Sequence, residues 1–127
     1  MSVMAHFNRM IGERMAAGGR MAMIETIGRR SGQARRTPVG YVRNQDGSVW
    51  LGAGRADSQW PKNLLASGTC RVRIGGDELG YTAVQLEGAR RSEAVTAIHA
   101  KYGGRASRVG TGPVFELRPL AVDEAAA

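Results

Sequence analysis

Residues 28–38 form an arginine-rich segment whose residue types are the best suited to chemistry in this sequence. It reads G-R-R-S-G-Q-A-R-R-T-P, with four arginines within eight residues. Glycines let backbone N–H groups turn toward an anion, and arginine makes charge-assisted hydrogen bonds to phosphate or carboxylate. Because expected strands flank the segment, we predict a loop that binds an anionic ligand; a solvated basic hairpin tip is the alternative. No G-x-x-x-x-G-K occurs, so the segment is not a P-loop.

Two shorter segments could add to a ligand site. Residues 53–55, Ala-Gly-Arg, end an expected strand, and small residues there would let a flat ligand approach the backbone. An ordinary bulge or strand end is the alternative. Further on, Lys62 and Asn63 fall in the first turn of an expected helix, whose N-terminus favours anions. Trp60 beside them could stack on an aromatic ligand or fill the core.

The other polar residues assemble no catalytic triad, no pair of carboxylates and no usual zinc site. The single cysteine, Cys70, lies on the inward face of an expected strand, and the histidines are His6 and His99. These three residues do not provide the four ligands of a structural zinc site. If the chain is an enzyme, a bound cofactor must carry the chemistry.

Length and composition predict one globular domain over residues 1–127. Apolar residues make up 43% and charged residues 23% of the chain, both near the averages of globular proteins. No apolar run reaches the ~20 residues of a membrane span, and the N-terminus lacks the apolar region of a secretory signal. With one cysteine, a reducing, cytoplasmic location is expected.

The net charge bears on the partners of the chain. Eighteen Lys and Arg residues against eleven Asp and Glu residues give +7 at pH 7. Such a charge permits nucleic acid, an anionic membrane surface or an anionic small molecule as partner. Aromatic residues make up only 6% of the chain and form no stacking platform, so we expect no nucleic acid partner.

The hydrophobic pattern predicts about six short antiparallel strands, at residues 21–27, 37–44, 49–54, 70–74, 78–86 and 114–120. Two helices interrupt them, one capped by Asp57 or Ser58 and ended by Gly68, the other near residues 89–102. Strands and helices do not alternate regularly. The pattern therefore favours a mainly β (α+β) small barrel with helices at its edges over a Rossmann fold.

A further helix is expected at the N-terminus. Residues 1–18 carry apolar side chains at helical spacing, and Gly18-Gly19 ends the expected helix. The apolar face would pack on the domain; the alternative is a basic amphipathic helix in peripheral contact with a membrane. The barrel core would then span residues 21–120, followed by a tail at residues 121–127.

The order of these motifs resembles the deazaflavin-dependent nitroreductase and quinone reductase family. The resemblance covers residues 21–120, and its most specific parts are the arginine-rich segment and W-x-x-N-L at residues 60–64. It implies a flavin-reductase-like split β-barrel that binds coenzyme F420, a deazaflavin with a phosphodiester and an oligoglutamate tail. That tail is polyanionic and suits the anion site inferred from charge.

The resemblance also implies which residues surround the coenzyme. The phosphate and tail would contact Arg29, Arg30, Ser31, Gly32, Arg35 and Arg36, and the next strand would start at Thr37 and Pro38. The deazaflavin would lie along Ala53, Gly54 and Arg55, and the pocket would be closed by Trp60, Lys62 and Asn63. Tyr102 would lie near the substrate side. No catalytic residue is assigned.

Together these features predict an oxidoreductase that transfers a hydride from reduced F420 to a quinone, an enone or a nitro acceptor. FMN is the alternative cofactor. The alternative functions are a non-catalytic protein that binds a flavin, a deazaflavin or a lipid, and a nucleic-acid-binding barrel. Split-barrel relatives often form dimers, so a homodimer is expected. The residues after Tyr102 are Gly-Gly-Arg, where nitroimidazole-reducing members are rich in tyrosine, and the acceptor stays open.

Overall fold

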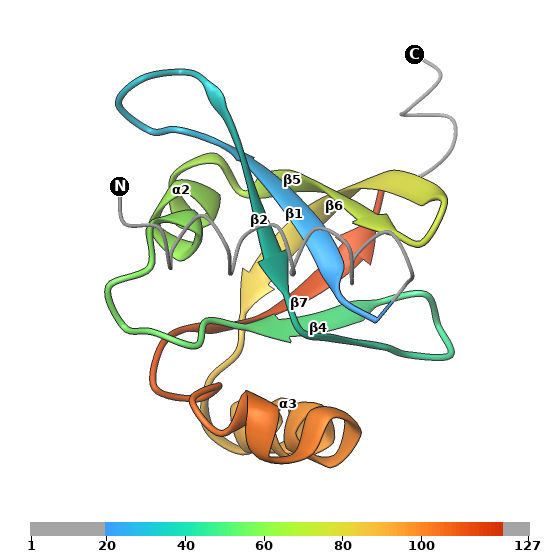
Figure 1. Ribbon diagram of the computed structural model, residues 1–127. Helices are drawn as coiled ribbons and strands as arrows, with labels where there is room; N and C mark the ends of the chain where they lie inside the picture. The colour runs from blue at the N-terminus through green and yellow to red at the C-terminus, as the bar shows by residue number, and fades with distance from the viewer. Residues whose placement is uncertain (1–19, 121–127) are drawn as a thin grey trace.

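The computed structural model describes residues 20–120 (Figure 1). The strands are β1 (Ala22–Ile27), β2 (Ala34–Val39), β3 (Tyr41–Arg43), β4 (Val49–Gly52), β5 (Thr69–Ile74), β6 (Asp77–Gln85) and β7 (Val114–Pro119). The helices are α2 (Gln59–Ser67) and α3 (Gly88–Tyr102), and the 3-10 helix η1 (Gly103–Ala106) follows α3. The expected helix at residues 1–18 and the expected tail at residues 121–127 lie outside the described residues.

The seven strands form one antiparallel sheet in the order β2-β1-β5-β6-β7-β4-β3. The two outermost strands, β2 and β3, are joined in the chain by Gly40 alone. One residue cannot span a flat sheet of seven strands, because neighbouring strands are ~4.8 Å apart. The sheet therefore curls until its edges meet, which gives a half-barrel (Figure 1). The mainly β split barrel expected from the sequence is confirmed.

The expected strand at residues 37–44 is two strands, so the prediction of six strands is short by one. At Gly40 the chain stops pairing with β1 and starts pairing with β4. A Cβ atom at Gly40 would lie 3.2 Å from the ring of Tyr102. The Tyr102 hydroxyl accepts a hydrogen bond from the Tyr41 backbone N–H (3.1 Å) and donates one to the Arg20 carbonyl (2.6 Å). These contacts are between residues far apart in sequence and leave no local signal.

The arginine-rich segment is also not entirely a loop, because β2 begins at Ala34. Its second half pairs with β1 along the whole strand, from Ala34 opposite Ile27 to Val39 opposite Ala22. Pro38 lacks an N–H donor but is tolerated, because β2 lies at an edge of the sheet. We expected all eleven residues of this segment to be a loop. The four residues from Ala34 to Thr37 lie in β2 instead and alternate between the two faces of the sheet, followed by Pro38 as the last residue of the segment.

The core fills the inside of the curled sheet. Cys70, Val72 and Ile74 alternate along β5 and are buried there, as the pattern predicts, together with Tyr81 and Phe115 from β6 and β7. Full burial of a Val, Ile or Phe side chain adds ~1.5–3 kcal/mol of hydrophobic stabilisation. The core thus fixes the register of the sheet, because a slip of one residue would turn this face to solvent.

The two helices pack on different strands: α2 lies beside the β1–β2 hairpin, and α3 lies below β4 in Figure 1. Helix α2 follows Ser58 and ends at Gly68, whose φ of 75° suits glycine. Its face with Trp60 and Leu64, four residues apart, is buried against the sheet. Helix α3 packs on β3, β4 and β7 instead. Within residues 20–120, no helix is long and apolar enough to cross a membrane.

Candidate functional site

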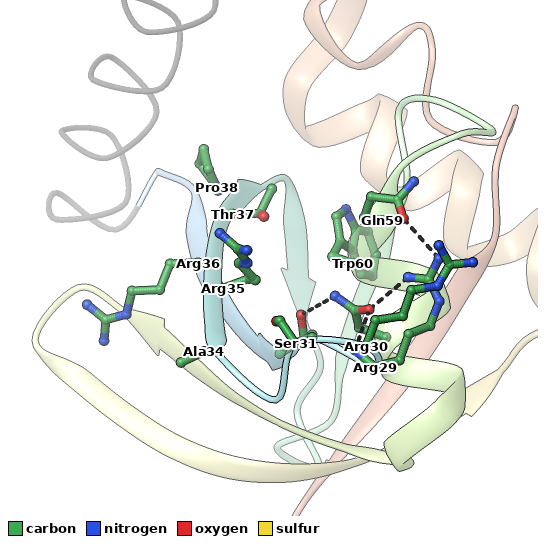
Figure 2. Close-up of a pocket in the computed structure, with 13 residues that line it drawn as sticks. Arg29, Arg30, Ser31, Ala34, Arg35, Arg36, Thr37, Pro38, Gln59 and Trp60 are labelled. Atoms are coloured by element: carbon green, nitrogen blue, oxygen red, sulfur yellow. Dashed lines mark hydrogen bonds between the residues drawn. The ribbon is translucent and has the colours of Figure 1, made fainter. Parts of the chain in front are cut away.

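A groove of about 800 Å³ lies between the β1–β2 hairpin and α2 (Figure 2). Its lining residues are Thr26, Gly28, Arg29, Arg30, Ser31, Ala34, Arg35, Arg36, Thr37, Pro38, Gln59, Trp60 and Asn63. Four of them are arginines and none carries a carboxylate. The structure therefore brings the arginine-rich segment and the start of α2 together in one basic groove.

The register of the hairpin decides which way each arginine of β2 points. Arg35 is opposite Thr26, and Arg36 is opposite Glu25. Successive side chains of a strand alternate between the faces of a sheet, and Thr26 is buried on the inner face. Arg35 therefore faces α2 across the groove, whereas Arg36 belongs to the outer face.

Arg36 is neutralised on that outer face. Its Nε lies 3.1 Å from Glu25 Oε2, and its Nη2 lies 2.9 Å from Glu78 Oε1. In Figure 2 its guanidinium points away from the other labelled arginines. Arg36 thus borders the groove with its backbone and stem, and its charge is balanced by two carboxylates.

Arg30 and Arg35 have no such balance. Neither side chain makes a hydrogen bond or an ion pair with the described part of the chain, residues 20–120. Both residues therefore add positive charge to the groove, and none of its described lining residues is a carboxylate. An anion in the groove would be attracted by both charges.

Arg29 is held by neutral amides of α2. Its Nη1 donates to Asn63 Oδ1 (2.9 Å), and its Nη2 donates to Gln59 Oε1 (3.0 Å). Its backbone N–H also donates to Asn63 Oδ1 (3.2 Å). These bonds tie the hairpin tip to the helix and fix the direction of the Arg29 guanidinium without cancelling its charge.

The tip of the hairpin is a closed turn. The Gly28 N–H donates to the Gln33 carbonyl and the Gly32 N–H to the Gly28 carbonyl, both at 2.8 Å. Gly32 has a φ of +71°, which other residues rarely adopt. Ser31 Oγ accepts the Gln33 N–H at 3.2 Å, and its own hydroxyl hydrogen stays available. The arginines thus extend from a turn that backbone hydrogen bonds hold in shape.

Trp60 both fills the core and lines the groove. It is 6% exposed, and its ring centroid lies 5.7 Å from that of Phe115 with the planes tilted by 52°. Tilted aromatic pairs at this distance are favourable. The interpretation of Trp60 as a core residue therefore holds for most of the ring, and its stacking on an aromatic ligand stays a prediction.

Six residues expected at the site lie outside the groove lining: Gly32, Ala53, Gly54, Arg55, Lys62 and Tyr102. Residues 53–55 pack against residues 111–113: the Ala53 N–H donates to the Pro113 carbonyl (2.9 Å), and Thr111 Oγ1 donates to the Gly54 carbonyl (3.3 Å). Arg55 pairs with Asp57 (3.1 Å), Lys62 is exposed on α2, and Tyr102 anchors α3 as described above. Their assignments stay predictions.

Sequence reasoning missed two polar residues of the groove. Thr26 is 1% exposed, and its hydroxyl accepts a hydrogen bond from Asn63 Nδ2 at 3.4 Å. The sequence signal that could have identified Thr26 is a polar residue at the two-residue spacing of the buried positions of β1. Gln59 binds Arg29 from the first turn of α2. No pattern marked it, because its role depends on the approach of the hairpin to the helix.

Cys70 has no part in this groove. The residue is buried in the core, and burial raises the pKa of its thiol to about 12. The thiolate is the reactive form of cysteine. Cys70 is therefore a packing residue, as its place in the strand pattern predicts.

Known proteins share this fold and, in part, this sequence. The chain is similar to a solved F420-H2 dependent reductase, FDR-A, with 25% identity and a TM-score of 0.66 over 78% of this chain and 94% of that one. A solved structure described as a domain-swapped dimer has 23% identity and a TM-score of 0.66 over 90% and 98%. The haem storage protein HutZ of Vibrio cholerae shares the fold at 12% identity, with a TM-score of 0.67 over 95% and 92%. No curated protein matches the chain.

The family model of F420H(2)-dependent quinone reductases matches residues 2–119, nearly the whole chain. Family members are oxidoreductases, and the name of the family gives their cofactor as coenzyme F420. The resemblance read from the arginine-rich segment and the W-x-x-N-L motif is confirmed. This chain belongs to the F420H2-dependent quinone reductase family and is an oxidoreductase that uses reduced coenzyme F420.

Proposed function

We propose that the groove between the β1–β2 hairpin and α2 holds the phosphodiester and glutamate tail of coenzyme F420. The observation that carries this proposal is that Arg30 and Arg35 have no partner within residues 20–120 and line a groove in which none of the described lining residues is a carboxylate. The fit is chemical: arginine forks match phosphate and carboxylate oxygens. A neutral or cationic ligand would leave the two charges unpaired.

Each element of the groove has a part in this binding. Arg30 and Arg35 bind the anionic end, and Ser31 offers a hydroxyl and Thr37 a second one beside them. Arg29 adds a third positive charge in a fixed direction. Trp60 excludes water from the floor of the groove, since it is buried against Phe115. Exclusion of water strengthens the charge pairs in the groove.

The deazaflavin ring is proposed to lie at residues 53–55, as the resemblance implies. The reduced coenzyme, when bound, supplies a hydride to the acceptor. The chain holds the coenzyme by its anionic end, which lowers the entropy of bringing donor and acceptor together. Lys62 is proposed to close the pocket, and Tyr102 is proposed to lie toward the acceptor. The acceptor class is an activated, electron-poor compound: a quinone, an enone or a nitroaromatic compound.

The first experiment is a binding titration with F420 and, in parallel, with FMN at the same salt concentration. The double variant Arg30→Ala/Arg35→Ala should bind F420 at least tenfold more weakly, because two charge-assisted contacts are lost. A matched control, Arg20→Ala/Arg71→Ala, removes the same charge from residues outside the groove lining. It should bind within about twofold of the unmodified protein.

Two results would overturn the assignment of the groove. One is equal affinity of the double variant and the control, which would mean that net charge alone attracts the coenzyme. The other is FMN binding as tightly as F420, because FMN carries no glutamate tail. A screen of quinone, enone and nitro acceptors with the reduced coenzyme, followed by its reoxidation, then identifies the substrate class. Reoxidation by none of them would favour a non-catalytic coenzyme-binding protein.

We also propose a homodimer with a peripheral membrane contact. The structural neighbour described as a domain-swapped dimer supports the first part. The expected amphipathic helix at residues 1–18 supports the second. Light scattering of the full chain should give twice the 13.6 kDa of one chain. Co-sedimentation with anionic vesicles should exceed that with neutral vesicles; equal binding or none would contradict the membrane contact.

A further inference from the structure

The way in which Arg29 is held points to a residue that acts through it. We propose that Asn63 is a positioning residue: it fixes Arg29 with a neutral acceptor, so that Arg29 keeps its full positive charge for the anionic end of the coenzyme. This inference rests on the proposed function. It assigns Asn63 a role that acts through Arg29, whereas the family resemblance implied that Asn63 closes the pocket.

The geometry of Asn63 suits this role. The residue is 4% exposed, and its Oδ1 accepts both the backbone N–H and Nη1 of Arg29. Its Nδ2 donates to Thr26 Oγ1 inside the sheet, which sets which end of the amide faces Arg29. The side chain therefore connects β1, the hairpin tip and α2.

The contrast with Arg36 shows why a neutral acceptor matters. Both arginines are held by two side chains, but Arg36 has Glu25 and Glu78, whereas Arg29 has the amides of Asn63 and Gln59. Carboxylates lie on the outer face of the hairpin, and none of the groove's lining residues within 20–120 is a carboxylate. A carboxylate at 2.9 Å would orient Arg29 equally well but would compete with a ligand anion for it.

The decisive variant is Asn63→Asp, because it changes charge and keeps shape. Its carboxylate can accept both Arg29 hydrogen bonds, and the Thr26 hydroxyl can turn to donate to it. The orientation of Arg29 and the thermal midpoint should therefore be retained. Asn63→Ala removes the acceptor altogether and should lower both the thermal midpoint and the affinity for F420.

Two probes separate the anionic end of the coenzyme from its ring: F420, and the same deazaflavin without phosphodiester and glutamate tail. We expect Asn63→Asp to weaken F420 binding on the order of tenfold, and binding of the tail-less deazaflavin by no more than about twofold. Gln85→Glu is the matched control, because it makes the same change at an exposed position outside the groove lining. It should change neither affinity beyond about twofold.

Two outcomes would overturn the proposal. If Asn63→Asp binds F420 as tightly as the unmodified protein, the neutrality of the acceptor has no role. If Asn63→Asp loses affinity for both probes together with its thermal midpoint, Asn63 only supports the fold. Failure of the proposed function is distinct from both: the unmodified protein would then bind F420 and the tail-less deazaflavin equally well.

Discussion

The four arginines of residues 28–38 have different roles because they have different neighbours. Arg36 is balanced by two carboxylates on the outer face, Arg29 is oriented by two amides, and Arg30 and Arg35 are unpaired within residues 20–120. Three of the four arginines can therefore act on an anion in the groove, because no carboxylate of residues 20–120 competes for them.

Cys70 gives a prediction at the same scale. Burial raises the pKa of its thiol to about 12, so only about one thiol in ten thousand is ionised at pH 8. We expect almost no reaction with a chromogenic disulfide reagent in the folded protein at pH 8. The same reagent should react with one thiol per chain in denaturant. Stoichiometric reaction within minutes without denaturant would show that the strand containing Cys70 opens.

Glu116 carries a prediction about pH. Burial by itself would raise the pKa of this carboxyl, but hydrogen bonds from Trp50 and Arg118 and the charges of Arg90 and Arg118 lower it below its usual value. A group with a lowered pKa in the folded protein stabilises it above the usual pKa, near 4.5, and this stabilisation is lost as the pH falls through the folded-state value.

Glu116→Gln should therefore lower the free energy of unfolding by about 1–3 kcal/mol at pH 7, since hydrogen bonds to a charged acceptor are lost. The difference between the variant and the unmodified protein should shrink as the pH falls below 4.5. Denaturant unfolding at pH 7 and at acidic pH measures it. A difference that is the same at both pH values would assign the effect to packing instead.

At the scale of elements, α3 is fastened to the barrel at both ends. Arg91 near its start donates to the carbonyls of Gly110 (2.6 Å) and Gly112 (3.1 Å). Tyr102 at its end bonds the backbone at Arg20 and Tyr41, and burial raises the pKa of its hydroxyl. Both anchors bond to backbone groups, so they fix the position of the helix against the chain before β1 and after η1.

Tyr102→Phe tests whether this tyrosine anchors the helix or faces the acceptor. Loss of two hydrogen bonds to backbone groups should lower the free energy of unfolding by about 1–3 kcal/mol. The Kd for F420 should stay within about twofold, because the hydroxyl is already engaged away from the groove. An unchanged thermal midpoint with a lower kcat would instead place the hydroxyl at the acceptor, as the family resemblance implies.

The sequence predicts elements well where the signal is local. The alternation of β5, the glycine that ends α2 and the span of α3 are all found within one or two residues of their predicted positions. The break at Gly40 and the start of β2 at Ala34 were not predicted, because Tyr102 and the pairing with β1 cause them. The same holds at the site: the cluster of arginines is visible in the sequence, but the face of each depends on the hairpin register.

At the scale of the whole molecule, the curl of the sheet concentrates positive charge in one groove, which the net charge of the chain alone does not do. The net charge of +7 alone would attract any anion weakly and without direction. Joining the two edges of the sheet at Gly40 brings the inner face of the hairpin toward the core side of the barrel, opposite α2. Three arginines that pair with no carboxylate of residues 20–120 then line one groove.

This arrangement predicts how salt acts on coenzyme binding. The groove is open to solvent, so its charge pairs are screened by added ions. Raising NaCl from about 50 to about 500 mM should weaken F420 binding on the order of tenfold, and binding of the tail-less deazaflavin by no more than about twofold. In Arg30→Ala/Arg35→Ala the salt dependence for F420 should fall toward that of the tail-less ligand. If both ligands depend on salt equally in the unmodified protein, the charge acts through the whole surface, and the curled sheet does not concentrate it.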